Sequence, residues 1–229
     1  MSENDAGPRA RLVAVGVDLV AREGVQALSL REIARQAGVS HGAPRRYFPT
    51  HAALLSAIAR QGFAGLADEV AAAMADCDAV DDDDTSAAGA GADAGAVVFG
   101  GGSPRARILA LGRVYLGFAA ANRGMFELMF RHDLLENGGL GQAPGLRETS
   151  LPLFGVLVDL VRRAGTRADG EPGPAEELTP EVVAGALWAN LHGVAQLWAW
   201  GSLQLASGDD DAEPLLRAAL DAHLGPERP

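Results

Sequence analysis

The chain has 229 residues, of which 48% are hydrophobic and 21% are charged. This composition fits a globular protein with a sizeable core and excludes a largely disordered, highly charged chain. No apolar run reaches 18 residues and no signal peptide is present, so we expect a soluble, cytoplasmic protein that does not enter a membrane. The single cysteine, Cys77, excludes an internal disulfide.

The charge of the chain is unevenly distributed. The net charge of −11 argues at first against a nucleic-acid-binding protein. However, residues 1–65 contain eight arginines and five acidic residues, a net charge of about +3, which leaves about −14 for the remainder. The local field at the contact surface governs association with DNA, so the first quarter of the chain is the candidate for such contact.

Three short helices are predicted in this first quarter. Apolar residues at helical spacing predict a helix from about Arg9 to Arg22. Ser29 and Glu32 have the spacing of a capping box, which predicts a second helix that starts at Leu30. Gly38 is expected to end it, because glycine tolerates the left-handed conformation that follows a helix C-terminus.

A third helix is predicted from Ser40, a favourable N-cap, with Pro44 in its first turn. Two short helices across a glycine turn form a helix-turn-helix, which places its second helix in the DNA major groove. A generic helical hairpin is the structural alternative. The residues between Ser40 and His51 favour DNA, because they include no carboxylate and several donors and cations: His41, Arg45, Arg46 and Tyr47.

Five segments match, in order and spacing, the DNA-binding domain of a known family: Ala21–Gly24, Leu28–Ala34, Gly38–Ser40, Tyr47–Pro49 and Ala53–Leu55. On these segments the first quarter resembles the TetR (tetracycline-repressor-type) family of bacterial regulators. The resemblance implies base-edge contacts for Arg31, His41 and Gly42. It implies phosphate contacts for Ser29, Arg45, Tyr47 and His51, with Arg46 as an additional candidate.

Two positions depart from the family pattern. The family usually has an aromatic residue at the position of Arg45 and a lysine at the position of His51. Arg45 can keep the phosphate contact as a cation. His51 would contribute less, because a histidine is mostly neutral at pH 7.

A longer helix is predicted from about His51 to Ala75, and it starts a second domain. We expect residues 1–50 to form the DNA-binding domain and residues 51–229 to form a helical ligand-binding and dimerisation domain. Residues 76–102 are acidic and then rich in Gly and Ala, which predicts a disordered insertion. A metal site in its Asp run is an alternative that lacks a fixed geometry.

Further helices are predicted over residues 103–121, 125–131, 146–163, from Thr179 to about Trp200, and 212–224. No strand-period pattern occurs, so the fold class is all-α. Trp188, His192 and Gly193 resemble the C-terminal "WHG" domain found behind some TetR-type DNA-binding domains. The expected architecture is an N-terminal three-helix helix-turn-helix domain followed by a C-terminal helical bundle for regulation and dimerisation.

The family resemblance implies that a small molecule binds within this bundle. Apolar and aromatic residues suit a hydrophobic effector, although each also suits an ordinary core. His192 is likewise either a core histidine or a ligand contact. The candidate ligand-binding residues are Tyr115, Phe118, Met125, Phe126, Met129, Phe154, Trp188 and His192.

No catalytic motif, phosphate-binding glycine loop or Cys/His cluster is present, so we expect no catalytic residues, no cofactor and no metal. The favoured hypothesis is a homodimeric, ligand-responsive repressor that binds a palindromic operator in double-stranded DNA. One alternative is an all-α small-molecule-binding protein or enzyme that has lost DNA binding. Another is an acidic adaptor that acts through residues 76–102.

Overall fold

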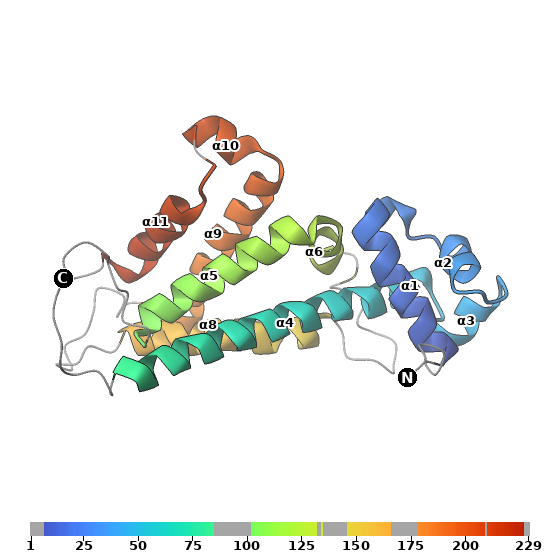
Figure 1. The fold of residues 1–229 in the computed structure, drawn as a ribbon, viewed down its shortest axis with the longest axis horizontal. Helices are drawn as coiled ribbons and strands as arrows, with labels where there is room; N and C mark the ends of the chain where they lie inside the picture. Colours follow the sequence, from blue (N-terminus) through green and yellow to red (C-terminus); the bar gives the residue numbers. More distant parts are fainter. Residues whose placement is uncertain are drawn as a thin grey trace. The chain divides into compact units, whose positions relative to one another are not determined.

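The structure, a computed structural model, describes residues 7–84, 102–131, 134, 146–165, 178–208 and 210–226. All regular secondary structure in these ranges is helical, which confirms the predicted all-α class (Figure 1). Within the same ranges, no helix is a candidate for spanning a lipid bilayer.

The chain divides into two compact units, and each unit combines two segments of the sequence. The first unit contains Met1–Gly65 and Ala121–Pro152, and the second contains Leu66–Ala120 and Leu153–Pro229. The boundary at residue 50 that we expected from the sequence marks the start of a helix. The two compact units divide further along that helix, between Gly65 and Leu66, and residues 123–129 pack with the first of them.

The first unit begins with the predicted short helices. Helix α1 (Pro8–Glu23) is followed by the 3₁₀ turn η2 (Val25–Ala27) and by helix α2 (Leu30–Gln36). Their apolar faces meet in a core that is fully or almost fully buried and includes Leu12, Leu19, Val20, Leu28, Ile33 and Ala34. The helical spacing of these residues in the sequence therefore predicts the packed face of the unit.

Helix α3 (Ala43–Tyr47) starts later than predicted, so the predicted start at Ser40 is wrong. With Ser40 as N-cap, Pro44 would occupy the position whose N–H normally donates to the N-cap carbonyl. Proline has no N–H and its ring would clash with that carbonyl. A start at Ala43 places Pro44 in the first turn, where its missing N–H loses no hydrogen bond.

Helix α4 (His51–Asp84) also continues beyond its predicted end near Ala75. Residues 76–84, expected to belong to a disordered insertion, are therefore helical, whereas residues 85–101 of that segment lie outside the described residues. Alanine is the best helix former and recurs through the preceding turns. In addition, Asp78 forms an ion pair of 2.5 Å with Arg107 at the start of helix α5 (Pro104–Ala121).

Glycines allow three close helix crossings in the first unit. A Cβ atom added to Gly16 of α1 would lie 2.3 Å from the Cδ1 atom of Ile58 on α4. One added to Gly62 of α4 would lie 2.6 Å from the Met125 side chain on helix α6 (Arg123–Met129). A methyl group at these positions would require the ends of the Ile58 and Met125 side chains to move.

The third crossing involves Gly124, on α6. A Cβ atom there would lie 2.6 Å from the backbone oxygen of Val20 on α1 and 3.2 Å from the Cα atom of Gly24. Helix α6 also contacts η2. The short helix α6 therefore belongs to the same packed unit as the helix-turn-helix, although it follows α5 in the chain.

The second unit contains the remaining helices: α8 (Leu146–Gly165, which begins in the first unit), α9 (Pro180–Ala199), α10 (Ser202–Ser207) and α11 (Glu213–Leu224). Helices α10 and α11 both pack against α9. Helix α10 was not predicted; it lies between Gly201 and Gly208, which have φ angles of +75° and +70°. Glycine adopts such angles without the cost that other residues incur.

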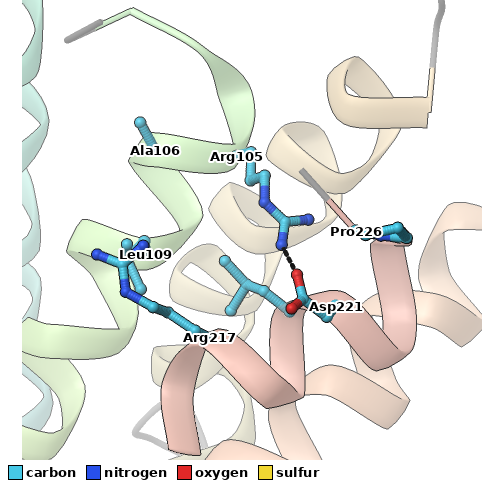
Figure 2. Close-up of a pocket in the computed structure, with 7 residues that line it drawn as sticks. Arg105, Ala106, Leu109, Arg217, Asp221 and Pro226 are labelled. Atoms are coloured by element: carbon cyan, nitrogen blue, oxygen red, sulfur yellow. Dashed lines mark hydrogen bonds and ion pairs between the residues drawn. The ribbon is translucent and has the colours of Figure 1, made fainter. Parts of the chain in front are cut away.

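Arginines of α5 connect that helix to α11. Arg105 forms an ion pair with Asp221 and donates to the Gly225 carbonyl at 2.8 Å, beside a small cavity of about 230 Å³ (Figure 2). Arg113 forms a second ion pair with Glu213. The Arg105 side chain is only 18% exposed, so we interpret this contact as a structural link that also satisfies the C-terminal end of α11.

We predict that Gly124→Ala destabilises the protein, because the new methyl group would press on a backbone carbonyl that cannot rotate away. Overpacking of this kind costs about 1–3 kcal/mol. Gly117→Ala is the matched control, since Gly117 lies on α5 with no atom within 4 Å of the added Cβ. It should raise stability by up to about 1 kcal/mol through helix propensity. Urea denaturation of both variants measures the difference, and equal effects would contradict the close packing of α6.

Candidate nucleic-acid interface

The turn between α2 and α3 has the geometry of a helix-turn-helix. The Ser29 side chain accepts a hydrogen bond from the backbone N–H of Glu32 at 3.2 Å, which confirms the predicted N-cap of α2. Gly38 has φ +65°, which confirms its predicted role at the end of that helix. The N–H of Val39 then donates to the Ala34 carbonyl at 3.1 Å and closes the turn.

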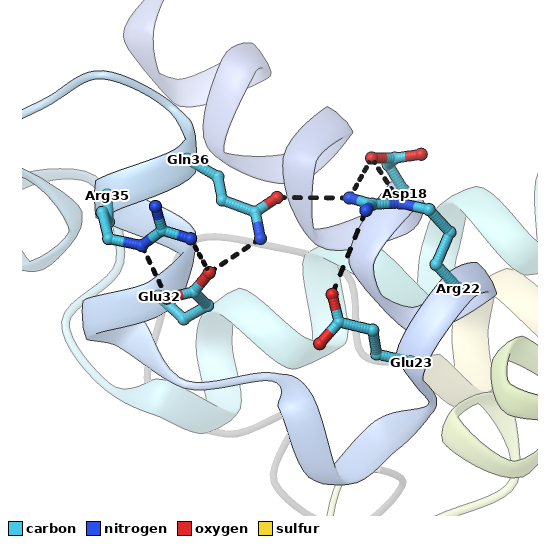
Figure 3. A network of polar contacts seen from close by, with 6 residues as sticks. All are labelled: Asp18, Arg22, Glu23, Glu32, Arg35 and Gln36. Carbon is cyan, nitrogen blue, oxygen red and sulfur yellow. Dashed lines mark hydrogen bonds and ion pairs between the residues drawn. The ribbon is translucent and has the colours of Figure 1, made fainter.

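The Glu32 side chain does not complete the capping box. Its carboxylate instead accepts hydrogen bonds from Arg35 and from the Gln36 amide, the latter at 2.8 Å (Figure 3). The Arg35 and Gln36 hydrogen bonds lower the pKa of Glu32 to about 2. In a complete capping box the Ser29 N–H would donate to the Glu32 carboxylate. Here it donates to the Ala27 carbonyl instead, at 2.8 Å.

This network continues to helix α1. Gln36 accepts a hydrogen bond from Arg22 at 3.3 Å, and Arg22 forms an ion pair of 2.7 Å with Asp18 (Figure 3). Arg22 and Arg35 are therefore neutralised by carboxylates of their own unit. They contribute little to the positive field of the unit.

The arginines of α2 and α3 that are predicted to contact DNA have a different environment. Arg31, Arg45 and Arg46 are exposed, and none of them forms an ion pair with another described residue. Tyr47 is 40% exposed at the end of α3. His41 and Gly42 are also exposed, but they lie in the turn that precedes α3.

His51 is held by a hydrogen bond within its own unit. It is the first residue of α4, and its Nε2 atom lies 2.7 Å from the backbone oxygen of Leu28. Because the carbonyl can only accept, the Nε2–H group donates to it, and only Nδ1 remains for another partner. The imidazole thus joins α4 to the loop before α2.

One neighbouring cation was not selected from the sequence. The Arg9 guanidinium lies 5.1 Å from the centroid of the Phe48 ring, which is buried directly after α3. This arrangement is a cation–π contact. The two residues are 39 positions apart, and no local pattern in the sequence indicates that they meet.

The predicted ligand-binding residues fall into both compact units. Tyr115 and Phe118 on α5, Phe154 on α8 and Trp188 and His192 on α9 belong to the second unit. Met125, Phe126 and Met129 on α6 are buried in the first unit. There the Phe126 ring packs 4.9 Å from that of Phe130, which in turn contacts Phe63 of α4. The three α6 residues are thus core residues of the helix-turn-helix unit.

Three side chains of the second unit that can form hydrogen bonds lie in one cluster. The Tyr115 hydroxyl lies 2.8 Å from Nδ1 of His192, and the Trp188 and His192 rings are 5.6 Å apart. Burial raises the pKa of Tyr115, and a hydrogen bond from Trp188 lowers it by less. The phenol therefore stays protonated, and it donates to Nδ1 in the tautomer that carries the histidine proton on Nε2.

We predict that His192 makes stability fall as the pH drops below about 6.5, the pKa of an unperturbed histidine. Burial lowers the pKa of His192, so the folded chain resists a proton that the unfolded chain accepts below about pH 6.5. The stabilisation is complete above pH 6.5 and is lost as the pH falls toward the lowered pKa. The ring is partly exposed, so water screens its charged form and the loss should be small.

His192→Asn tests this, because its amide oxygen can still accept from Tyr115 but cannot titrate. Urea denaturation at pH 7.5 and pH 5.5 should show a smaller pH dependence for this variant. Carboxylates whose pKa is lowered, such as that of Glu213, make stability depend on pH only at lower pH. An unchanged pH dependence would exclude His192 as its source.

Comparisons with known proteins agree with this geometry. A family model described as bacterial regulatory proteins of the tetR family matches residues 12–58, and one described as the tetracyclin repressor-like C-terminal domain matches residues 108–223. No curated protein sequence matches the chain.

Solved structures share the fold along almost the whole chain. A protein of unknown function from Rhodococcus sp. RHA1 is 28% identical, with 98% of this chain and 97% of that chain covered and a TM-score of 0.68. The multidrug binding protein EbrR, complexed with imidazole, is 22% identical, with 98% of both chains covered and a TM-score of 0.56.

A member of the TetR family from Streptomyces coelicolor A3 is 22% identical, with 96% of this chain and 99% of that chain covered and a TM-score of 0.55. The C-terminal family match alone covers half of the chain, and the N-terminal match covers the helix-turn-helix. The chain therefore belongs to the tetR family of bacterial regulatory proteins.

Proposed function

We propose that this protein is a homodimeric repressor that binds a palindromic operator and is released from it by a small hydrophobic effector. One observation carries the DNA-binding part of this proposal. Arg31, Arg45 and Arg46 on α2 and α3 form no ion pair with another described residue, whereas Arg22 and Arg35 in the same unit are paired. Unpaired exposed cations are available to phosphate.

The contacts with DNA divide into two kinds. We assign Ser29, Arg45, Arg46 and Tyr47 to the phosphate backbone, where donors and cations set the position of the protein. Arg31, His41 and Gly42 are assigned to base edges, since arginine commonly reads guanine and glycine permits a close approach. His51 is a weaker phosphate contact in this scheme, because its Nε2 atom is bound to Leu28.

An apolar outer face on α9 supports the homodimer. Exposed residues recur there at helical spacing, with large side chains near both ends and small ones between: Val182, Ala186, Ala189, Leu197 and Trp200. Trp200 is 64% exposed, and Leu205 on the adjacent α10 is 89% exposed. A contiguous apolar surface of this kind is typical of a protein interface. We propose that α9 and α11 of two copies pack as a four-helix bundle.

The second unit is the proposed effector site. Phe118 and Phe154 would supply apolar surface, while the cluster of Tyr115, Trp188 and His192 would orient a polar group of the ligand. The effector must bind more tightly to the conformation that does not fit the operator, because only differential affinity shifts such an equilibrium. The buried α6 residues Met125, Phe126 and Met129 belong to the core in this proposal.

A second candidate function is a small-molecule-binding protein that has lost DNA binding. The observation that favours it is the engagement of His51, at a position where the family usually has a lysine. An electrophoretic shift assay on DNA from upstream of its own gene, with a salt series, separates the two. A specific band that weakens steeply with salt supports the regulator, and no shift from folded, dimeric protein supports the alternative.

We predict that Arg45→Ala and Tyr47→Ala weaken binding to operator and to unrelated DNA by similar factors, because both remove backbone contacts. Arg45→Ala should also reduce the salt slope by about one. Arg123→Ala is the matched control, since Arg123 is an exposed arginine of the first unit on α6. Fluorescence anisotropy with both DNAs measures this, and unchanged affinity of Arg45→Ala would refute the assigned surface.

We predict that Ala189→Arg converts the dimer to a monomer, because an unpaired guanidinium would be buried in the interface at a cost of about 3 kcal/mol or more. Ala72→Arg introduces the same side chain at an exposed position of α4 and serves as the control. Sedimentation velocity of both variants gives the association state. A dimeric Ala189→Arg variant would place the interface elsewhere.

A further inference from the structure

Arg9 places a cation of helix α1 beside the end of α3. Its guanidinium lies 5.1 Å from the centroid of the Phe48 ring, and Phe48 directly follows Tyr47, the last residue of α3. The Phe48 N–H donates to the Pro44 carbonyl of α3 at 2.8 Å, and the Phe48 side chain is buried. The ring is therefore fixed to α3, and Arg9 lies next to the surface that carries the proposed phosphate contacts.

Arg9 is accessible, and no carboxylate occupies it. The side chain is exposed and forms no ion pair within the part of the chain that the structure describes. The sequence contains no acidic residue over 7–17 or over 33–67. Neither α3 nor the first half of α1 therefore supplies a carboxylate that would compete with a phosphate for this guanidinium.

The contact with the ring orients Arg9 and leaves it able to bind an anion. A guanidinium over an aromatic ring is attracted to the electrons of the ring face, while its N–H groups can still donate to oxygen. A side chain held in this way has lost part of its rotamer freedom before DNA binds. The entropic cost of a phosphate contact is then lower than for an unrestrained arginine.

We propose that Arg9 binds a backbone phosphate beside the C-terminal end of α3, and that Phe48 positions it for this contact. The contact rests on the proposed DNA-binding function and deepens it, because it adds helix α1 to the DNA surface. A phosphate is the expected partner, since the ring holds Arg9 outside the helix that enters the major groove.

Fluorescence anisotropy of the full chain tests the contact, with DNA from upstream of its own gene and with a scrambled duplex. Arg9→Gln should weaken binding to both DNAs about eightfold at 0.1 M salt and lower the salt slope by about 0.9, the effect of one lost phosphate contact. Arg9→Lys keeps the charge and should restore the slope. Arg123→Gln removes an exposed arginine of α6 and should change neither quantity. Unchanged affinity of Arg9→Gln would overturn the proposal.

Neutral phosphates distinguish a direct contact from an effect on folding. Single phosphates of the upstream DNA are replaced by methylphosphonate, one position at a time, and the loss of affinity is measured at each position. Arg9→Gln should become insensitive to replacement at one phosphate, and Arg45→Ala should become insensitive at a different one. If Arg9→Gln kept its sensitivity at every position, Arg9 would not contact a phosphate.

Phe48→Leu tests the positioning role, because it keeps an apolar side chain and removes the ring. It should weaken DNA binding about two- to fivefold, the range expected for an exposed cation–π contact. In the Arg9→Gln background it should have little further effect. Sensitivity at the phosphate assigned to Arg45 should persist, which shows that α3 has not moved. Additive effects of the two substitutions would refute the positioning role of Phe48.

Failure of this contact is distinguishable from failure of the proposed function. If the unaltered chain binds DNA and Arg45→Ala weakens binding but Arg9→Gln does not, only the contact from α1 is refuted. If the unaltered, folded chain binds neither DNA at low salt, the proposed regulator and this contact are refuted together.

Discussion

The close crossings of helices at glycines determine how the first unit is built. At Gly16 and Gly124 an added methyl group would collide with a neighbouring helix, and at Gly124 the collision is with backbone. Glycine within a helix costs up to about 1 kcal/mol relative to alanine, so these positions are unfavourable for an isolated helix. Close packing offsets that cost only while α1, α4 and α6 stay together.

This constraint positions the candidate DNA-binding surface. The network of Glu32, Gln36 and Arg22 holds α2 on α1, and the Nε2 atom of His51 binds the loop before α2. Side chains that fix the unit are thereby occupied, and Arg45 and Arg46 on α3 remain at the surface. The division between structural and available cations follows from which arginines have a carboxylate within reach.

The sequence predicts features that depend on local chemistry. The Ser29 cap, the Gly38 turn and the apolar faces of α1 and α2 follow from residue type and helical spacing, and the structure confirms them. Two helix boundaries differ from the predicted ones, because Pro44 excludes a helix start at Ser40 and alanine-rich turns extend α4 beyond Ala75.

Contacts between distant residues could not be predicted at all. The position of Arg9 over Phe48, the binding of His51 to Leu28 and the location of Met125 in the first unit depend on how helices pack. Neither the helical spacing of residues nor a motif in a single sequence specifies those distances. Exposure cannot be predicted from the sequence either, because the exposed apolar residues of α9 have the same types and helical spacing as core residues.

The discontinuous make-up of the first unit has a consequence for synthesis on the ribosome. The helix-turn-helix is complete in sequence by residue 50, but its packing partner α6 ends only at Met129. Until that helix emerges, the surface of α1 around Val20 has no neighbour from residues 121–152. The nascent N-terminal segment therefore reaches its final stability only after about half of the chain has been synthesised. This order differs from the usual one, in which N-terminal domains fold first.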